Sequence, residues 1–188
     1  IQWKWKYDYL DEDLTIYSSL DDNSNEVSQR NSGIDPMQSE NYLRDVDEPI
    51  VLPINTKIRI LTTAADVIHA WWVPDLGWKR DAIPGFINDN WAIIEKVGVY
   101  RGQCAEICGA GHGYMPIVVK AVTMDDYTAW VSEKKIEQEA KNNTKDMVLT
   151  MAELMTKGEG VYKAQCIACH QATGEGIKGV FPSIAGSS

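Results

Sequence analysis

The stretch Cys104-Ala-Glu-Ile-Cys108-Gly-Ala-Gly-His112-Gly-Tyr-Met115 brings two thiols, an imidazole and a thioether into one short segment. Soft sulfur ligands select copper, zinc or iron–sulfur clusters, and imidazole suits copper and zinc. A mononuclear blue-copper site needs two histidines, one cysteine and a weak axial methionine. His69, at the end of a strand-like run upstream, completes that set and leaves one cysteine over. The surplus thiolate indicates bridging, and therefore two copper ions.

Two other interpretations of this segment stay open. Cys104 and Cys108 could form a disulfide. Alternatively, both thiols together with His69 and His112 could bind a structural zinc ion tetrahedrally. Met115 and the glycine-rich loop favour copper, because neither a disulfide nor a zinc site needs a thioether at this spacing.

Short strand-like runs around this segment predict a mainly β fold, an antiparallel sandwich or barrel. Residues 2–9 alternate aromatic and polar side chains, which predicts a half-buried strand with Trp3 and Trp5 on one face. Pro, Gly and Asn separate the later runs. The later strands are expected at 50–52, 57–63, 67–72, 91–95, 99–101 and 117–122. The Ser-, Asn- and Asp-rich residues 18–48 are predicted to be a long loop.

Two helical patterns follow the last of these strands. Thr123 precedes Asp126 by three residues, as in a capping box, and predicts a helix from about 125 toward 141. A second helical pattern covers about 151–168. We therefore expect a copper domain at 1–132, a charged helical linker at 133–149 and a further segment at 150–188.

The motif Cys166-Ile-Ala-Cys169-His170 is the attachment signature of c-type haem, with His170 as an axial ligand. A bare Cys-x-x-Cys could also be a redox pair or half of a zinc site, but the following histidine favours haem. No Met follows His170, and Met155 would lie about 22 Å away along one continuous helix. We expect a truncated, α-helical cytochrome c segment without a native His/Met haem.

The composition narrows the class of partner. A net charge of −9 argues against nucleic acid, whose phosphates need a basic surface, and favours a basic protein. No stretch approaches the roughly 18 apolar residues of a membrane span, and no signal peptide is present. The chain reads as a soluble piece of a longer protein.

These motifs resemble cytochrome c oxidase subunit II over about residues 1–132. The resemblance rests on His69, the segment 104–115, Asp81-Ala-Ile-Pro-Gly and the opening Gln2-Trp3-Lys4-Trp5. It implies a cupredoxin-like Greek-key β-sandwich that holds the binuclear copper centre CuA. The C-terminal motif resembles the bacterial arrangement in which subunit II is fused to a cytochrome c, so haem c is expected in the full-length protein.

The resemblance also implies roles for individual residues. Cys104 and Cys108 would bridge the two coppers, and the Glu106 carboxylate would face a magnesium site shared with subunit I. The implied copper ligands are His69, Cys104, Glu106 through its backbone carbonyl, Cys108, His112 and Met115. Many members carry arginine after Pro-Gly, where this chain has Phe86, so this chain lacks the arginine that contacts subunit I or haem propionates in those members.

The implied function is electron transfer in a respiratory oxidase. CuA would accept electrons from soluble or fused cytochrome c and pass them to subunit I, where oxygen is reduced. No oxygen-reducing site is expected in this chain, because every histidine is already assigned. The parent protein would be membrane-anchored, with this part on the periplasmic face of a bacterial inner membrane.

Electrons would enter through Trp3, and nearby acids would dock a basic cytochrome c. These docking acids are Asp8, Asp11, Glu12 and Asp13. Two alternatives remain: the CuA domain of a nitrous oxide reductase, which lacks a trailing haem motif, and a zinc-binding or copper-carrying module without an electron-transfer role.

Overall fold

The structure is a computed structural model that describes residues 1–28, 32–145, 149–162, 166, 170–177 and 181–186. The chain divides into two compact units, Ile1–Glu139 and Ala140–Ser188. Among the described residues, no helix is both long enough and apolar enough to cross a membrane.

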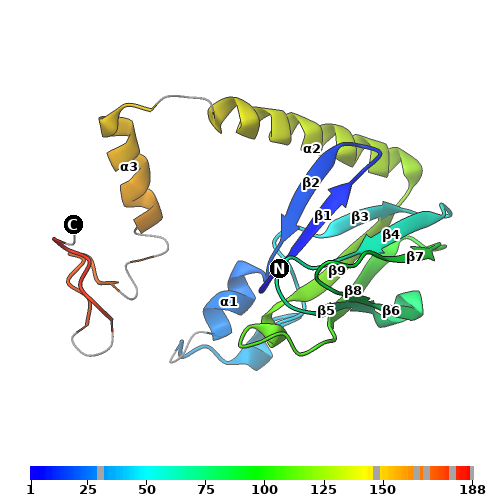
Figure 1. Cartoon of the computed structure of the whole chain (residues 1–188), viewed down its shortest axis with the longest axis horizontal. Coiled ribbons are helices and arrows are strands. Elements are labelled where there is room, and N and C mark those ends of the chain that lie inside the picture. Colours follow the sequence, from blue (N-terminus) through cyan, green and yellow to red (C-terminus); the bar gives the residue numbers. More distant parts are fainter. Residues whose placement is uncertain (29–31, 146–148, 163–165, 167–169, 178–180, 187–188) are drawn as a thin grey trace. The chain divides into compact units, whose positions relative to one another are not determined.

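A five-stranded sheet in the order β3-β9-β8-β5-β6 forms the centre of the first unit (Figure 1). Its strands are β3 (Ile50–Pro53), β5 (His69–Val73), β6 (Trp78–Ala82), β8 (Gly98–Cys104) and β9 (Pro116–Val122). β3 pairs with β9 in parallel, and the other neighbours are antiparallel. Short 3₁₀ turns, η2 (Pro74–Leu76) and η3 (His112–Tyr114), lie between strands.

Two antiparallel pairs complete the β structure: β1 (Trp5–Tyr9) with β2 (Leu14–Ser18), and β4 (Ile58–Thr62) with β7 (Asn88–Ala92). Side chains from β1, β5, β8 and β9 meet in one apolar core. Within it Trp71 stacks on Trp78 with ring centroids 5.0 Å apart and donates a hydrogen bond to the Tyr7 hydroxyl at 3.2 Å. The predicted mainly β architecture is confirmed.

Helix α2 (Met124–Lys145) follows β9 and packs along the β1–β2 hairpin (Figure 1). The Thr123 hydroxyl accepts from the Asp126 backbone N–H at 3.2 Å, so the predicted cap is present. Trp130 packs against Tyr9 with ring centroids 5.2 Å apart. Tyr127, Trp130 and Val131 are partly buried, whereas most of the charged residues before Glu139 are exposed, as is typical of a helix with one face toward the protein.

The structure corrects two sequence expectations near the N-terminus. The predicted strand 2–9 begins only at Trp5, so Trp3 lies outside it and is 37% exposed while Trp5 is 7% exposed. The predicted loop 18–48 contains helix α1 (Asp22–Ser28) and the 3₁₀ turn η1 (Pro36–Gln38). This helix forms because Asp21 caps it through the Ser24 N–H at 2.9 Å and Val27 is buried.

The second unit contains helix α3 (Met151–Val161), which starts where the sequence predicted. Thr150 and Glu153 form a reciprocal capping box at its first turn. The helix was predicted to reach 168; its α-helical part ends at Val161, and residues 163–165 and 167–169 lie outside the described residues. Further along, Ile177 and Phe181 pair as an antiparallel bridge.

Candidate metal centre and the haem motif

Strand ends bring the predicted copper ligands together. His69 is the first residue of β5, Cys104 is the last of β8, and β5 and β8 pair side by side. The chain then loops through η3 and returns at Met115, immediately before β9. The Cys104 N–H donates to the Met115 carbonyl at 3.2 Å, which closes the loop between the two strands.

The sulfur and nitrogen atoms of this loop face one another. The Cys104 Sγ lies 3.8 Å from the Cys108 Sγ and 3.9 Å from His69 Nδ1. The Cys108 Sγ lies 3.5 Å from His112 Nδ1 and 3.6 Å from the Met115 Sδ. Each histidine therefore turns its Nδ1 toward a thiol.

The Glu106 backbone carbonyl adds an oxygen 3.4 Å from the Cys104 Sγ, while its carboxylate is exposed. His69, Cys104, Cys108 and Met115 are almost completely buried, so solvent does not compete for their ligand atoms.

This donor set fits metal binding. The ligand atoms of His69, Cys104 and Cys108 all lie within 4.8 Å of one another. Metal–thiolate bonds are about 2.3 Å long, so sulfurs 3.8 Å apart can contact the same ion. Both cysteines are free thiols in the structure. Burial raises the pKa of the Cys108 thiol to about 11, with the neighbouring Cys104 adding to the effect, so metal binding would displace a proton.

Asp66 supports the far side of the His69 ring. Its Oδ1 lies 2.9 Å from His69 Nε2, which fixes the ring and leaves Nδ1 directed at Cys104. Burial alone would raise the pKa of the Asp66 carboxyl, but hydrogen bonds from His69 and from the Gln2 and Val67 backbone hold it well below its usual range. The carboxylate thus remains charged at neutral pH and favours an Nε2–H tautomer.

Replacing Asp66 by alanine is expected to lower copper affinity about 10- to 100-fold, as is typical when a partner of a metal-binding histidine is lost. The His69 ring would lose its acceptor without any change of ligand. Competition with a calibrated chelator measures the affinity. Asp89→Ala serves as the control, because it removes an exposed carboxylate paired with Arg59. Equal affinities in the two variants would contradict the role of Asp66.

The N-terminal residues contact the same loop. The Trp3 indole N–H donates to the Cys108 carbonyl at 3.1 Å, and the Gln2 side-chain amide donates to the same oxygen at 2.9 Å. The Gln2 backbone N–H donates to Asp66 at 2.7 Å. Gln2 and Asp66 were missed by sequence reasoning, because only the fold brings them to the loop. The one feature of the sequence that could have indicated the Asp66–His69 contact is their spacing, since Asp66 lies three residues before His69.

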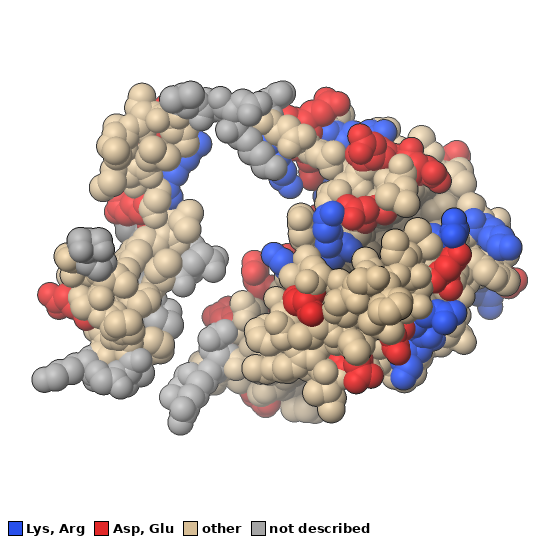
Figure 2. Space-filling view, in the orientation of Figure 1, with Lys and Arg blue, Asp and Glu red and all other residues tan. Residues whose placement is uncertain are grey.

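The predicted docking acids lie elsewhere on the hairpin. Asp8 pairs with Lys6 at 2.8 Å, and Asp11, Glu12 and Asp13 occupy the turn between β1 and β2. That turn is at the end of the hairpin away from Trp3, and β1 alone spans about 13 Å at 3.3 Å per residue. On the face shown in Figure 2, acidic and basic side chains are interspersed.

The haem motif is described in part, because Cys169 lies outside the described residues. Cys166 is a partly buried free thiol. The His170 Nδ1 lies 3.0 Å from the Pro182 carbonyl, and the Phe181 ring packs edge-on against the imidazole with centroids 6.5 Å apart. An imidazole held through Nδ1 presents Nε2 for an axial bond, so these residues fit haem ligation.

With this geometry in place, comparisons with known proteins decide the family. Residues 1–122 match the family described as cytochrome c oxidase subunit II, periplasmic domain. The chain belongs to the cytochrome c oxidase subunit II family. Residues 155–188 match the cytochrome c family, so the subunit II domain is followed by a cytochrome c segment.

Individual relatives agree. The chain is 44% identical over 137 residues to cytochrome c oxidase subunit 2 of Triticum aestivum, covering 73% of this chain and 51% of that protein. It is 42% identical over 149 residues to the probable cytochrome c oxidase subunit 2 of Rickettsia prowazekii, covering 79% of this chain and 44% of that protein. The chain thus spans about half the length of the curated relatives that it matches.

A solved structure shows the same fold. The periplasmic domain of subunit II of cytochrome oxidase from Bradyrhizobium japonicum matches with a TM-score of 0.63 and 35% identity, covering 72% of this chain and 88% of that one. The predicted cupredoxin-like fold is confirmed. As a member of this family, the chain contains an electron-transfer domain whose expected cofactor is CuA, and the cytochrome c segment implies haem c.

Proposed function

We propose that this chain accepts electrons from a cytochrome c at a CuA centre and delivers them to subunit I of a respiratory oxidase. The observation that carries the proposal is the buried cluster of two thiols flanked by two Nδ1-presenting histidines and a thioether. The copper pair would supply a one-electron redox centre, and the fixed positions of its protein ligands would keep rearrangement small during each transfer. The residues that would hold the copper pair are His69, Cys104, Glu106, Cys108, His112 and Met115.

The protein's own residues contribute rigidity and insulation. The Met115 carbonyl accepts from the Cys104 N–H and from the Trp5 indole at 3.4 Å, so the loop is tied to the sheet. Trp5 also packs edge-on against His69 with ring centroids 6.1 Å apart. A preorganised, water-poor site needs little reorganisation when its charge changes, which suits electron transfer.

Two residues beside the cluster fit contacts with subunit I and with cytochrome c. The exposed Glu106 carboxylate could face a magnesium site shared with subunit I, and Trp3, bonded to the Cys108 carbonyl, could receive electrons. The parent protein would be anchored in a bacterial inner membrane, with this part in the periplasm. The division would be a CuA domain at 1–132, a helical linker at 133–149 and a cytochrome c segment at 150–188.

The match of residues 155–188 to cytochrome c favours this assignment over a nitrous oxide reductase. The Met115 thioether, 3.6 Å from the Cys108 Sγ, is a fifth donor that a four-ligand zinc site does not need. A mixed-valence absorption spectrum of the copper-loaded protein would support CuA. A colourless protein that retains zinc, or a single-copper spectrum, would overturn it.

Replacing Trp3 by alanine should slow reduction by cytochrome c at least about tenfold while leaving copper content intact, since small losses of alignment can cost up to a hundredfold. Trp91→Ala, which removes another exposed tryptophan on β7, is the matched control. Stopped-flow mixing with reduced, basic cytochrome c measures the rate. An unchanged rate in the Trp3 variant would remove this role.

If acidic side chains dock a basic cytochrome c, its rate of association with this protein should fall steeply with added salt. Neutralising Asp8, Asp11, Glu12 and Asp13 together by amide substitution should reduce both the low-salt rate and its salt slope. The same stopped-flow measurement over a salt series reads out both quantities. A salt-independent rate would contradict docking, and an unchanged slope in the variant would place the docking surface on other acids.

Covalent haem is expected at Cys166 and Cys169 when the protein is made with haem-attachment machinery outside the cytoplasm. Denaturing mass spectrometry should show a haem-sized increment that disappears when both cysteines are replaced by alanine and persists in Cys104→Ser. A missing increment in protein matured this way would contradict the haem assignment.

A further inference from the structure

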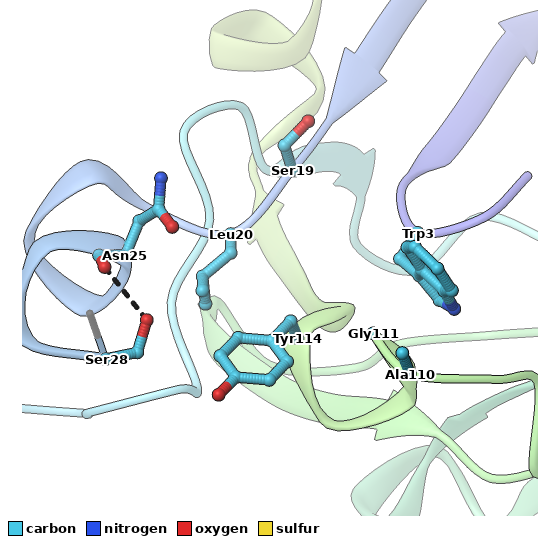
Figure 3. Close-up of a pocket in the computed structure, with 8 residues that line it drawn as sticks. All are labelled: Trp3, Ser19, Leu20, Asn25, Ser28, Ala110, Gly111 and Tyr114. Carbon is cyan, nitrogen blue, oxygen red and sulfur yellow. Dashed lines mark hydrogen bonds between the residues drawn. The ribbon is translucent and has the colours of Figure 1, made fainter. Parts of the chain in front are cut away.

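Trp3 lies directly on the metal-binding loop. Figure 3 shows its indole beside Ala110 and Gly111, and these residues line a pocket together with Tyr114 and with Asn25 and Ser28 of α1. The indole N–H is bonded to the Cys108 carbonyl at 3.1 Å. Ring contact and hydrogen bond together fix the position of Trp3 relative to a cysteine whose sulfur belongs to the cluster.

Gly111 leaves the space that the ring occupies. A Cβ atom at this position would lie 2.7 Å from the Trp3 Cε3 and closer still to Cγ and Cδ2. The ring would have to move by about 1 Å to restore an ordinary contact of 3.5 Å or more. At Gly109 a Cβ would meet the edge of the same ring at 3.1 Å, a milder conflict.

The backbone of Gly111 does not itself require glycine. Its φ of −91° and ψ of 14° are accessible to any residue, unlike the φ of +109° at Gly109. The indole is therefore the feature that excludes a side chain at this position.

We infer that Gly111 is a positioning residue for Trp3: its missing side chain lets the indole rest on the loop and bond to the Cys108 carbonyl. Gly111 contributes no ligand atom and acts only through the ring. The inference rests on the proposed role of Trp3 in receiving electrons, and assigns to Gly111 the alignment of that path.

The neighbouring pocket makes Gly111→Ala an informative variant. The pocket beside the ring has a volume of about 540 Å³. A displaced indole can move toward this space, so the added methyl group can be accommodated without breaking the loop or its ligands. Copper content and the copper spectrum should therefore match those of the unaltered protein.

The test compares Gly111→Ala with Gly113→Ala, in which the same methyl group points into open space two residues away. Reduction of the copper-loaded protein by basic cytochrome c should slow by roughly tenfold in Gly111→Ala, since a displacement of about 1 Å between reacting groups can cost up to a hundredfold. The rate of Gly113→Ala should equal that of the unaltered protein. In the Trp3→Ala background, Gly111→Ala should cause no further loss.

A second readout separates this inference from the proposed function. The Trp3 indole N–H resonance, assigned by its loss in Trp3→Ala, should shift and exchange faster with solvent in Gly111→Ala but not in Gly113→Ala. An unmoved resonance together with an unchanged rate would overturn the role of Gly111. If the resonance moves in Gly111→Ala but the rates of both Gly111→Ala and Trp3→Ala are unchanged, Gly111 does position the Trp3 ring. The role of Trp3 as electron acceptor would then be overturned.

Discussion

Replacing Cys108 by serine is expected to abolish the binuclear copper centre while the β fold persists. The Cys108 sulfur lies within 3.8 Å of three other donor atoms of the cluster: Cys104 Sγ, His112 Nδ1 and Met115 Sδ. A serine hydroxyl is a hard, weakly acidic ligand that does not replace a bridging thiolate. Copper should fall from two ions per chain to one or none.

Elemental analysis and the visible spectrum of the reconstituted protein measure this result. Cys166→Ser is the matched control, since it removes a thiol from the second unit and should leave copper binding unchanged. Circular dichroism checks that the sheet remains folded. Two coppers and an unaltered spectrum in the Cys108 variant would refute a bridging role for this sulfur.

The residues proposed to bind copper could be picked out from the sequence because most of them lie within one loop, Cys104 to Met115. His69, the exception, was placed by the strand pattern, and the structure brings its Nδ1 to 3.9 Å from the Cys104 Sγ. Contacts around the ligands could not be predicted. Gln2 reaches the Cys108 carbonyl across 106 positions of sequence, and no local pattern carries that information.

Two structural elements escaped prediction for physical reasons. Strand β6 reads Trp-Lys-Arg-Asp-Ala and lies at the edge of the sheet, where charged residues are tolerated because one side faces solvent. Helix α1 has a composition typical of a loop, and its single deeply buried apolar residue, Val27, becomes visible as a core residue only in three dimensions. In both cases tertiary contacts override local propensity.

Replacing Gly102 by alanine is expected to destabilise the first unit by about 3 kcal/mol, the upper part of the range for overpacked sites. A Cβ atom here would lie 2.8 Å from both the Val73 Cα and the Trp72 carbonyl carbon, and closer still to the Trp72 oxygen. Backbone atoms cannot rotate away as a side chain can. Strand β8 would therefore have to separate from β5.

That separation would also reach the metal cluster, because β5 begins with His69 and β8 ends with Cys104, two residues beyond Gly102. Chemical denaturation of the copper-free protein measures the loss of stability, and copper titration measures the second effect. Gly98→Ala is the control on the same strand, since its nearest neighbour is the Tyr100 ring at an ordinary 3.6 Å. If both variants unfold at the same denaturant concentration, the close approach of β5 and β8 at Gly102 does not hold in solution, and the spacing of His69 and Cys104 must be maintained by other contacts.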